Sequence, residues 1–305
     1  MTIFVHGSIN LDIIARVERL PESGETVLAL DTARLPGGKG ANQAIAAASC
    51  GAKVEMSGLV GDDADGRFMI DRLRAAGVGV TGIGVHETAP TGTALIAVDR
   101  ESENFIIVAS GANAHVTAPA AAPAGLLLVQ AEIPLGPLAQ AMRAATGMVV
   151  FNAAPAIAGA DALFPFCEIV IVNQAELAAF ANKAQDGAAT DEERARALLC
   201  RPGQSIVVTL GRDGALVIDA SGAFHFPGHQ VETIDTTGAG DCFCGAFAAR
   251  LDQGFAIGSA ARFANAAAAL STTRHGAGPS MPRTEEVVDF LQNLKTNREA
   301  DHDAT

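Results

Sequence analysis

Short apolar runs alternate with amphipathic segments along most of this chain. Runs of strand length end at polar or glycine-rich turns, at 3–10, 54–60, 126–130, 148–151, 169–172, 205–210 and 215–219. Apolar residues recur with helical spacing at 66–76, 241–251 and 260–271. Because strands that alternate with helices form parallel sheets with right-handed crossovers, the pattern predicts an α/β fold with a doubly wound, mainly parallel sheet.

Two segments interrupt this alternation of predicted strands and helices. Residues 93–99 and 104–109 are apolar or alternating on either side of a charged turn at 100–103, which predicts a β-hairpin. Residues 26–30 predict a strand away from the main sheet, with which the hairpin can pair. An exposed small sheet needs a cover, so we expect a β lid from about 12–36 and 91–110 that closes over a ligand and contributes a dimer contact.

Length and composition bound the class of protein. A chain of 305 residues with 49% hydrophobic content can bury a large core, and we expect one domain over 1–295 with a frayed tail over 296–305. The net charge of −13 disfavours nucleic acid or a membrane surface as a partner. No apolar run reaches the ~20 residues of a membrane span, and the start lacks the basic region of a secretory signal, so we expect a cytoplasmic protein.

The segment 235–241, Asp-Thr-Thr-Gly-Ala-Gly-Asp, leads directly into an apolar helix. Gly238, Ala239 and Gly240 have no side chain large enough to keep an anion from the free N–H groups and the positive dipole end of that helix. Asp241 follows in the first turn, where its carboxylate can accept a proton from an attacking hydroxyl. Glycine-rich turns before helices are common, and an Asp there is also a good cap, so this segment alone leaves both interpretations open.

A second glycine-flanked helix start lies at 36–44, Pro-Gly-Gly-Lys-Gly-Ala-Asn-Gln-Ala. Lys39 and Asn42 beside a bare helix start favour contact with a polar ligand over packing alone. Polar residues also follow the predicted strands, namely Asn10, Asp12, Glu132, Asn173 and Glu176. In open α/β sheets this edge is where ligands bind.

With these motifs in place, the chain resembles the ribokinase-like (PfkB-type) carbohydrate kinases from about residue 4 to about residue 280. The shared motifs lie at 7–10, 37–44, 61–63, 111–114, 152–156, 173–176, 209–211 and 235–241. The resemblance implies a ribokinase-like fold and an ATP-dependent phosphotransferase that acts on the primary hydroxyl of a pentose. D-ribose, converted to ribose 5-phosphate, is the first candidate substrate.

The resemblance also implies a role for each matching residue. Asp241 is the expected catalytic base, and Gly238, Ala239 and Gly240 form the expected anion hole for the phosphoryl group. The sugar is expected at Asn10, Asp12, Gly38, Lys39, Asn42, Glu132 and Asp241. ATP is expected at Asn173, Glu176, Thr209, Gly211, Gly214, Gly240 and Asn265, with Mg²⁺ and its waters near Asn173 and Glu176. Ala153 and the residues around Glu132 depart from the usual family pattern, which leaves the pocket shape open.

A monovalent cation is a further implication of the resemblance. Asp235 and Thr237 precede the glycines, and Ser271, Arg274, Gly276 and Ser280 follow the late helix in a glycine-rich loop. Their spacing alone favours a helix-capping loop, with Asp235 as a turn residue. Family members hold K⁺ at these positions, so we expect K⁺ as an activator.

Several alternatives remain within and outside the fold. A nucleoside or pseudouridine kinase, or a kinase of another sugar, would share all the motifs. A nucleoside needs stacking surface for its base, whereas the chain has no Trp, no Tyr and 14 Phe. A catalytically silent sugar-binding protein is disfavoured because Asp241 and its glycines are present. We therefore expect a homodimeric kinase whose ligands are a small sugar and ATP.

Overall fold

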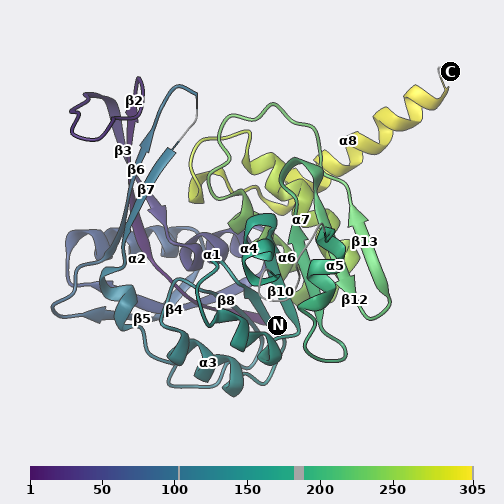
Figure 1. The fold of residues 1–305 in the computed structure, drawn as a ribbon, viewed down its shortest axis with the longest axis horizontal. Helices are drawn as coiled ribbons and strands as arrows, with labels where there is room; N and C mark the ends of the chain where they lie inside the picture. Colours follow the sequence, from purple (N-terminus) through teal and green to yellow (C-terminus); the bar gives the residue numbers. More distant parts are fainter. Residues whose placement is uncertain (102–103, 182–188, 304–305) are drawn as a thin grey trace.

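In the computed structural model, which describes residues 1–101, 104–181 and 189–303, the main sheet has nine strands (Figure 1). Their order is β13-β12-β11-β10-β9-β8-β1-β4-β5. The strands are β1 Thr2–His6, β4 Lys53–Gly61, β5 Gly79–His86, β8 Leu126–Gln130, β9 Val149–Asn152, β10 Ile169–Asn173, β11 Ser205–Thr209, β12 Ala215–Asp219 and β13 Gly222–Phe226. Neighbours pair in parallel, except that β12 is antiparallel to β11 and β13. The predicted mainly parallel α/β sheet is therefore confirmed.

Helices cover both faces of the main sheet. One face packs against α1 Lys39–Ser49, α2 Ala64–Ala75, α6 Ala239–Asp252, α7 Ile257–Ser271 and α8 Thr284–Asp303. The other packs against α3 Leu135–Ala144, α4 Gln174–Ala181, α5 Asp191–Ala197 and the short η2 Ala160–Phe166. Further single turns are η1 Gly111–His115, η3 Gly211–Asp213 and η4 Gly278–Ser280. Because the central strands are covered on both faces, they are buried along nearly their whole length.

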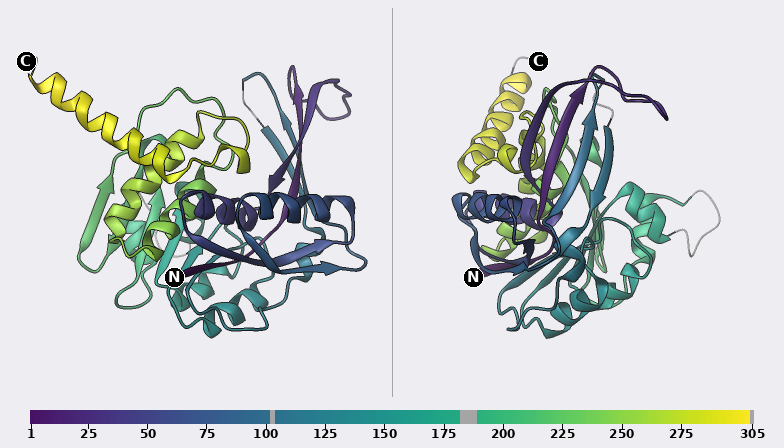
Figure 2. Two further views of the ribbon diagram at one scale, coloured as in Figure 1. Left: turned by 180° about the vertical axis from the view of Figure 1, so that it is seen from behind. Right: turned by 90° about the vertical axis from the view of Figure 1, so that its left-hand side faces the viewer.

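The last helix, α8, leaves the body of the molecule and projects outward (Figures 1 and 2). Its backbone is helical as far as Asp303, through most of the segment predicted as a frayed tail, and residues 304–305 lie outside the described part. Among the described residues, no helix combines the length and the apolar character needed to span a bilayer.

A second sheet of four strands, hereafter the small sheet, stands beside the main one in the order β3-β2-β6-β7 (Figures 1 and 2). It contains β2 Asn10–Val17, β3 Ala29–Gly37, β6 Gly92–Val98 and β7 Asn104–Ala109. The predicted hairpin corresponds to β6 and β7, although its turn residues 102–103 lie outside the described part. The strand predicted at 26–30 is wrong in its bounds and partner: β3 begins at Ala29 and pairs with β2 rather than with the hairpin.

The predicted first strand, 3–10, also differs from the structure. The chain leaves the main sheet after His6 and enters the small sheet at Asn10, so one predicted strand is two. Asn10 and Asp12 therefore lie just past the end of β1, as predicted, but inside β2 rather than in a turn. This connection joins the two sheets at the edge where the site lies.

Helices α1 and α6 contact each other closely at Gly245. An ideal Cβ on Gly245 would lie 2.5 Å from the Ala46 Cβ and 2.5 Å from the Gln43 carbonyl oxygen, closer than real side chains approach. The missing side chain lets the two helix backbones approach each other. The starts of α1 and α6 thus lie side by side at the edge of the sheet.

Candidate active site

Polar side chains converge where the parallel strands of the main sheet end. Gln130 and Glu132 lie at and beyond the end of β8, Asn152 ends β9 and Asn173 ends β10. Helices α1 and α6 begin at the same edge and bring Asn42 and Asp241 to it, as their direct hydrogen bond shows. The structure therefore brings together residues that are far apart in sequence.

Asp241 is the centre of this cluster. It lies in the first turn of α6 and its side chain is only 8% exposed. Asn42 Nδ2 donates to its Oδ2 at 3.0 Å, and Gln43 Nε2 donates to its Oδ1 at 2.9 Å. Both donors are on α1, so the carboxylate is held from one side by two amides. Each oxygen retains further acceptor capacity for a hydroxyl proton.

Lys39 contributes the positive charge of the cluster. Its backbone N–H donates to Glu132 Oε2 at 3.0 Å, and Ser8 Oγ donates to the same oxygen at 2.5 Å. The negative charge of Asp241, followed by those of Glu132 and Glu176, raises the pKa of Lys39 although burial opposes this. Lys39 is therefore a stable cation surrounded by carboxylates.

Asp12 is buried in β2 close to two other acids. Burial, together with the charges of Glu132 and Asp241, raises the pKa of its carboxyl to about 7. A carboxyl with this pKa is present in both protonation states near neutral pH. It can therefore either donate a hydrogen bond to a ligand oxygen or accept one from a ligand hydroxyl.

A cavity of about 420 Å³ opens beside these residues and is lined by Ser8, Asn10, Ser110, Asn113 and Glu132 among others. Asn113 Nδ2 donates to Asn10 Oδ1 at 2.7 Å, and the Asn113 side chain also bonds the backbone N–H and C=O of Ile9. Among the described residues, the buried Oδ1 of Asn42 has no hydrogen-bond partner. An unpaired buried acceptor fits a ligand that brings hydroxyl donors.

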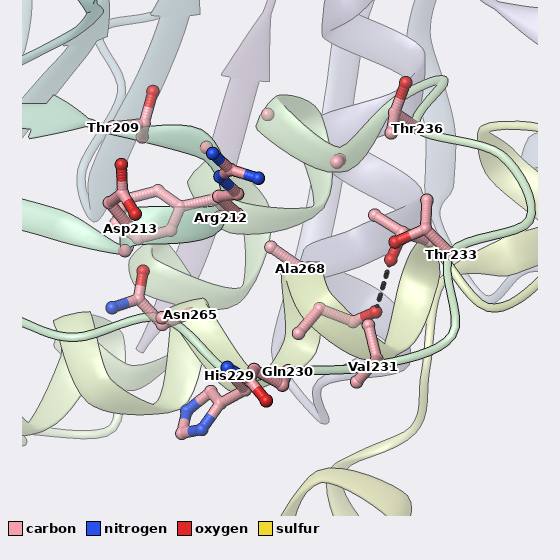
Figure 3. A pocket seen from close by; sticks show the side chains of 18 residues that line it. Thr209, Arg212, Asp213, His229, Gln230, Val231, Thr233, Thr236, Asn265 and Ala268 are labelled. Atoms are coloured by element: carbon pink, nitrogen blue, oxygen red, sulfur yellow. Dashed lines mark hydrogen bonds between the residues drawn. The ribbon is translucent and has the colours of Figure 1, made fainter. Parts of the chain in front are cut away.

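A second cavity, of about 780 Å³, lies against the start of α6 (Figure 3). Its lining includes the predicted nucleotide residues Thr209, Gly211, Gly214, Gly240 and Asn265. Figure 3 shows side chains from η3, from the loop at 228–236 and from α7 around it. Asn265 Nδ2 is already engaged, because it donates to the Phe226 carbonyl at 2.9 Å. The volume suits a small organic ligand.

The two other predicted nucleotide residues, Asn173 and Glu176, are not among the residues that line this cavity. They cap α4 reciprocally: Asn173 N donates to Glu176 Oε2 and Glu176 N donates to Asn173 Oδ1, both at 2.8 Å. Burial is the main reason that the pKa of Glu176 is raised, and Asp241 adds to it. Glu176 thus faces the carboxylate cluster.

The predicted anion hole precedes Asp241 directly. Gly238 is the N-cap of α6 with φ 75°, and Ala239 and Gly240 both line the larger cavity. The Ala239 N–H donates to the Thr236 carbonyl at 3.2 Å, so one of the three predicted amides is engaged in the turn. The start of α6 therefore borders the larger cavity and carries Asp241 in its first turn.

The residues predicted to bind a cation lie in two segments of the chain, 235–237 and 271–280, and Asp235 joins these segments through hydrogen bonds. Its carboxylate accepts from the N–H of Thr237 and of Gly276, both at 2.8 Å. Burial raises the pKa of Asp235, but these hydrogen bonds outweigh burial and lower it overall. Ser271 Oγ and Ser280 Oγ each donate to a nearby backbone carbonyl, and the Arg274 side chain pairs with Glu286. Arg274 can therefore contribute its backbone carbonyl but not its side chain.

Gln43 and Asn113 belong to the site but were not predicted there. Both lie inside the motifs at 36–44 and 111–114, yet their spacing gave no sign of the side chains that they contact. The available signal was a second amide, at 43, directly after Asn42 in an otherwise apolar helical run, Gly40–Ala47, of which every residue is buried. A buried amide needs hydrogen-bond partners, and such partners can lie far away in sequence.

Comparison with known proteins agrees with this arrangement. A family model described as pfkB family carbohydrate kinase matches residues 2–284. The ribokinase of Haemophilus influenzae is 35% identical over 96% of this chain and 99% of that protein. A deoxyribokinase of Salmonella typhi is 32% identical over 95% of this chain and 99% of that protein.

Solved structures extend the likeness to the fold. A ribokinase from Thermotoga maritima has a TM-score of 0.86 and 34% identity, and the match covers 96% of this chain and 99% of that one. A ribokinase from Arabidopsis thaliana, solved in complex with ribose and ATP, has a TM-score of 0.81 and 29% identity over 95% of this chain and 98% of that one. On the sheet topology, the site and these matches, the chain belongs to the pfkB family of carbohydrate kinases.

Proposed function

We propose that this chain is an ATP-dependent ribose kinase, which transfers the γ-phosphate of ATP to the primary hydroxyl of ribose. The observation that carries the proposal is buried Asp241 in the first turn of α6, directly after Ala239 and Gly240, which line the cavity of about 780 Å³. The cavity of about 420 Å³, which Asn10 and Glu132 help to line, is proposed to take the sugar. The ribokinases that resemble this chain at about a third identity support ribose as the acceptor and ATP as the donor.

The reaction needs mainly positioning and charge neutralisation. The primary hydroxyl oxygen of ribose attacks the γ-phosphorus, its proton passes to Asp241, and the bond to the β–γ bridging oxygen breaks to release ADP. The N–H groups and dipole at the start of α6 stabilise the charge on the transferring phosphoryl group. Lys39 balances the acidic cluster. Asn10, Asp12, Asn42 and Glu132 hold the sugar hydroxyls.

Mg²⁺ fits this site as a partner of the nucleotide. Among the described residues, no group of three or more His, Cys, Asp and Glu side chains forms a metal cage. Mg²⁺ commonly keeps several waters and binds through one or two carboxylates together with substrate phosphates. Glu176, a half-buried carboxylate held by the Asn173 N–H, is the residue that would hold it through water. The ion would neutralise charge on the ATP phosphates.

Ribose selectivity tests the proposed function directly. Because several buried polar groups face the sugar, loss of one hydroxyl leaves a partner unpaired. We expect ribose to be preferred over 2-deoxyribose by more than the ~1 to 3 kcal/mol typical of an apolar difference, measured as kcat/KM from ADP release. Equal values would favour the deoxyribokinase activity named for one relative. A clear preference for a nucleoside would replace the proposal by the nucleoside kinase alternative.

K⁺ is proposed as an activator that acts through the backbone. A cation bound by carbonyl oxygens beside Thr237, near the Asp235 carboxylate, would fix the neighbouring Gly238–Gly240 amides toward the phosphate. We expect activity in a buffer free of sodium and potassium to rise when KCl is added at constant ionic strength, and Asp235→Ala to weaken that response. An unchanged rate with KCl, together with an unchanged response in Asp235→Ala, would contradict the cation site.

The small sheet is proposed to be both a lid over the sugar and a dimer interface. Its inner residues Ile14, Ala94 and Ile96 are buried against their neighbours. Other apolar residues, on β6 and β7, are 49–64% exposed, namely Leu95, Phe105, Ile106, Ile107 and Val108. An exposed apolar edge of this kind favours pairing with a second copy. We expect a dimer mass by light scattering at micromolar concentration; a monomer would remove the dimer part and leave the lid.

A further inference from the structure

Gln43 is a buried polar residue that the proposed reaction does not yet use. Its side chain is fully buried in α1, yet it makes three hydrogen bonds to other side chains. Nε2 donates to Asp241 Oδ1 and to Asn152 Oδ1, both at 2.9 Å. Oε1 accepts from Gln130 Nε2 at 2.8 Å. The amide therefore links Asp241 on α6 to the ends of β8 and β9.

The direction of these hydrogen bonds follows from the backbone. Asn152 Nδ2 donates to the Ile171 carbonyl at 3.2 Å, so the other end of its amide, Oδ1, is an acceptor. A carbonyl can only accept, which fixes the orientation of Asn152 and in turn requires a donor from Gln43. Rotating the Gln43 amide by 180° would set its oxygen against two acceptor oxygens and its nitrogen against the Gln130 donor. The Nε2 group therefore has one stable direction, toward Asp241.

We propose that Gln43 is the positioning residue for Asp241. It holds the Oδ1 oxygen of the carboxylate in place, so that the remaining acceptor capacity of the carboxylate faces the sugar hydroxyl. The proposal rests on the function proposed above. Asn42 also donates to Asp241, but its own Oδ1 has no partner among the described residues. Gln43, in contrast, is fixed at both ends of its amide. It is thus the rigid one of the two supports of the carboxylate.

Other charged groups also act on Asp241 and must be the same in any comparison. Lys39 on α1, Asp12 on β2 and Glu176 on α4 interact with its charge, as do the buried thiols of Cys242 and Cys244 on its own helix. None of these residues changes when Gln43 is replaced. A difference between Gln43 variants and the parent chain therefore reports the loss of the Gln43 amide and its three hydrogen bonds.

The test compares Gln43→Met with a matched control, Gln204→Met. Gln204 is 1% exposed and also makes three hydrogen bonds, to Phe164 O, Cys167 O and Cys200 N, on the other face of the sheet. Both changes remove a buried amide of the same size, so both cost stability. We expect Gln43→Met to lower kcat about 10- to 100-fold with ribose KM changed less than threefold. Gln204→Met should keep kcat within about twofold of the parent among folded molecules.

A second readout separates positioning from a purely structural role. An N–H donor stabilises the ionised carboxylate. Its removal should therefore move the acidic limb of the profile of kcat against pH to higher pH, by about one pH unit. The same shift should occur in a carboxyl ¹³C NMR titration of the ligand-free protein, with the Asp241 resonance identified by its loss in Asp241→Asn. This titration needs no turnover, so it tests the role of Gln43 even if ribose is not the substrate.

The outcomes are distinct. A lower kcat and a shifted limb in Gln43→Met, absent in Gln204→Met, support the proposal. A folded Gln43→Met with parental kcat and an unshifted titration overturns it. If Gln43→Met does not fold, Gln43→Glu replaces it: a second carboxyl beside Asp241 should raise the apparent pKa of the pair by more than one pH unit, and an unshifted titration there overturns the proposal too.

Discussion

We expect Asp241→Asn to lower kcat by at least ~10²-fold while ribose and ATP still bind. Asn has nearly the same size as Asp, but it cannot accept the hydroxyl proton. In the structure it also replaces one of two acceptor oxygens by an NH₂ group, which would face Asn42 or Gln43 as a second donor. Steady-state kinetics and isothermal calorimetry separate turnover from binding.

Asp252→Asn is the matched control for this experiment. Asp252 is the last residue of the same helix and its carboxylate is also buried, but it pairs with the N-terminal ammonium group instead of the cluster. We expect that variant to keep kcat within about twofold, because no reacting atom is near it. Near-normal turnover by Asp241→Asn would end the assignment of Asp241 as the base.

The second large effect is expected at the start of α6. Gly238 has φ 75°, and an ideal Cβ there would lie 2.5 Å from the Ala277 Cβ and 2.8 Å from the Ala277 Cα. Gly238→Ala must therefore displace backbone, either its own turn or the loop that contains Ala277. Because displacements of about 1 Å at a reacting centre can cost ~10²-fold, we expect kcat/KM to fall by at least that much.

Gly254→Ala controls for the backbone strain alone. Gly254 follows α6 with φ 86°, and no heavy atom lies within 4 Å of an ideal Cβ on it. In both variants a side chain in the left-handed region lowers the free energy of unfolding by ~1–2 kcal/mol. Thermal unfolding measures this loss of stability. We expect a large kinetic defect in Gly238→Ala only. Equal activity of the two variants would mean that the α6 start does not orient the phosphoryl group.

The main sheet was predictable because its central strands are buried on both faces and so read as continuous apolar runs. β5 and β13 were not predicted, since edge strands expose much of their length and β5 contains Gly79, Gly82 and Gly84. β2 was not predicted as a strand because it contains Asp12 and Arg16 and does not alternate regularly. The small sheet and its β6–β7 hairpin were therefore foreseen, but the pairing of β2 with β3 and with β6 was not.

The site was predictable where glycines mark a helix start, because such glycines can be recognised from the sequence alone. Asp241 and Asn42 were named from these motifs, and the hydrogen bond between them now joins the two. Gln43 and Asn113 were missed because their partners lie 198 and 103–104 residues away, a relation that no local pattern contains. The reciprocal cap formed by Asn173 and Glu176 was readable in principle from its spacing of three residues.

The close contact of α1 and α6 at Gly245 has a consequence for how this enzyme can diverge. At Gly245 no side chain separates the helix that carries Asp241 from the helix that carries its two amide donors. Of the four residues proposed to hold the sugar hydroxyls, Asn42 comes from α1, and the other three come from elsewhere, from β2 and from beyond β8. Substrate preference can therefore drift through substitutions in those elements while the catalytic geometry is inherited intact.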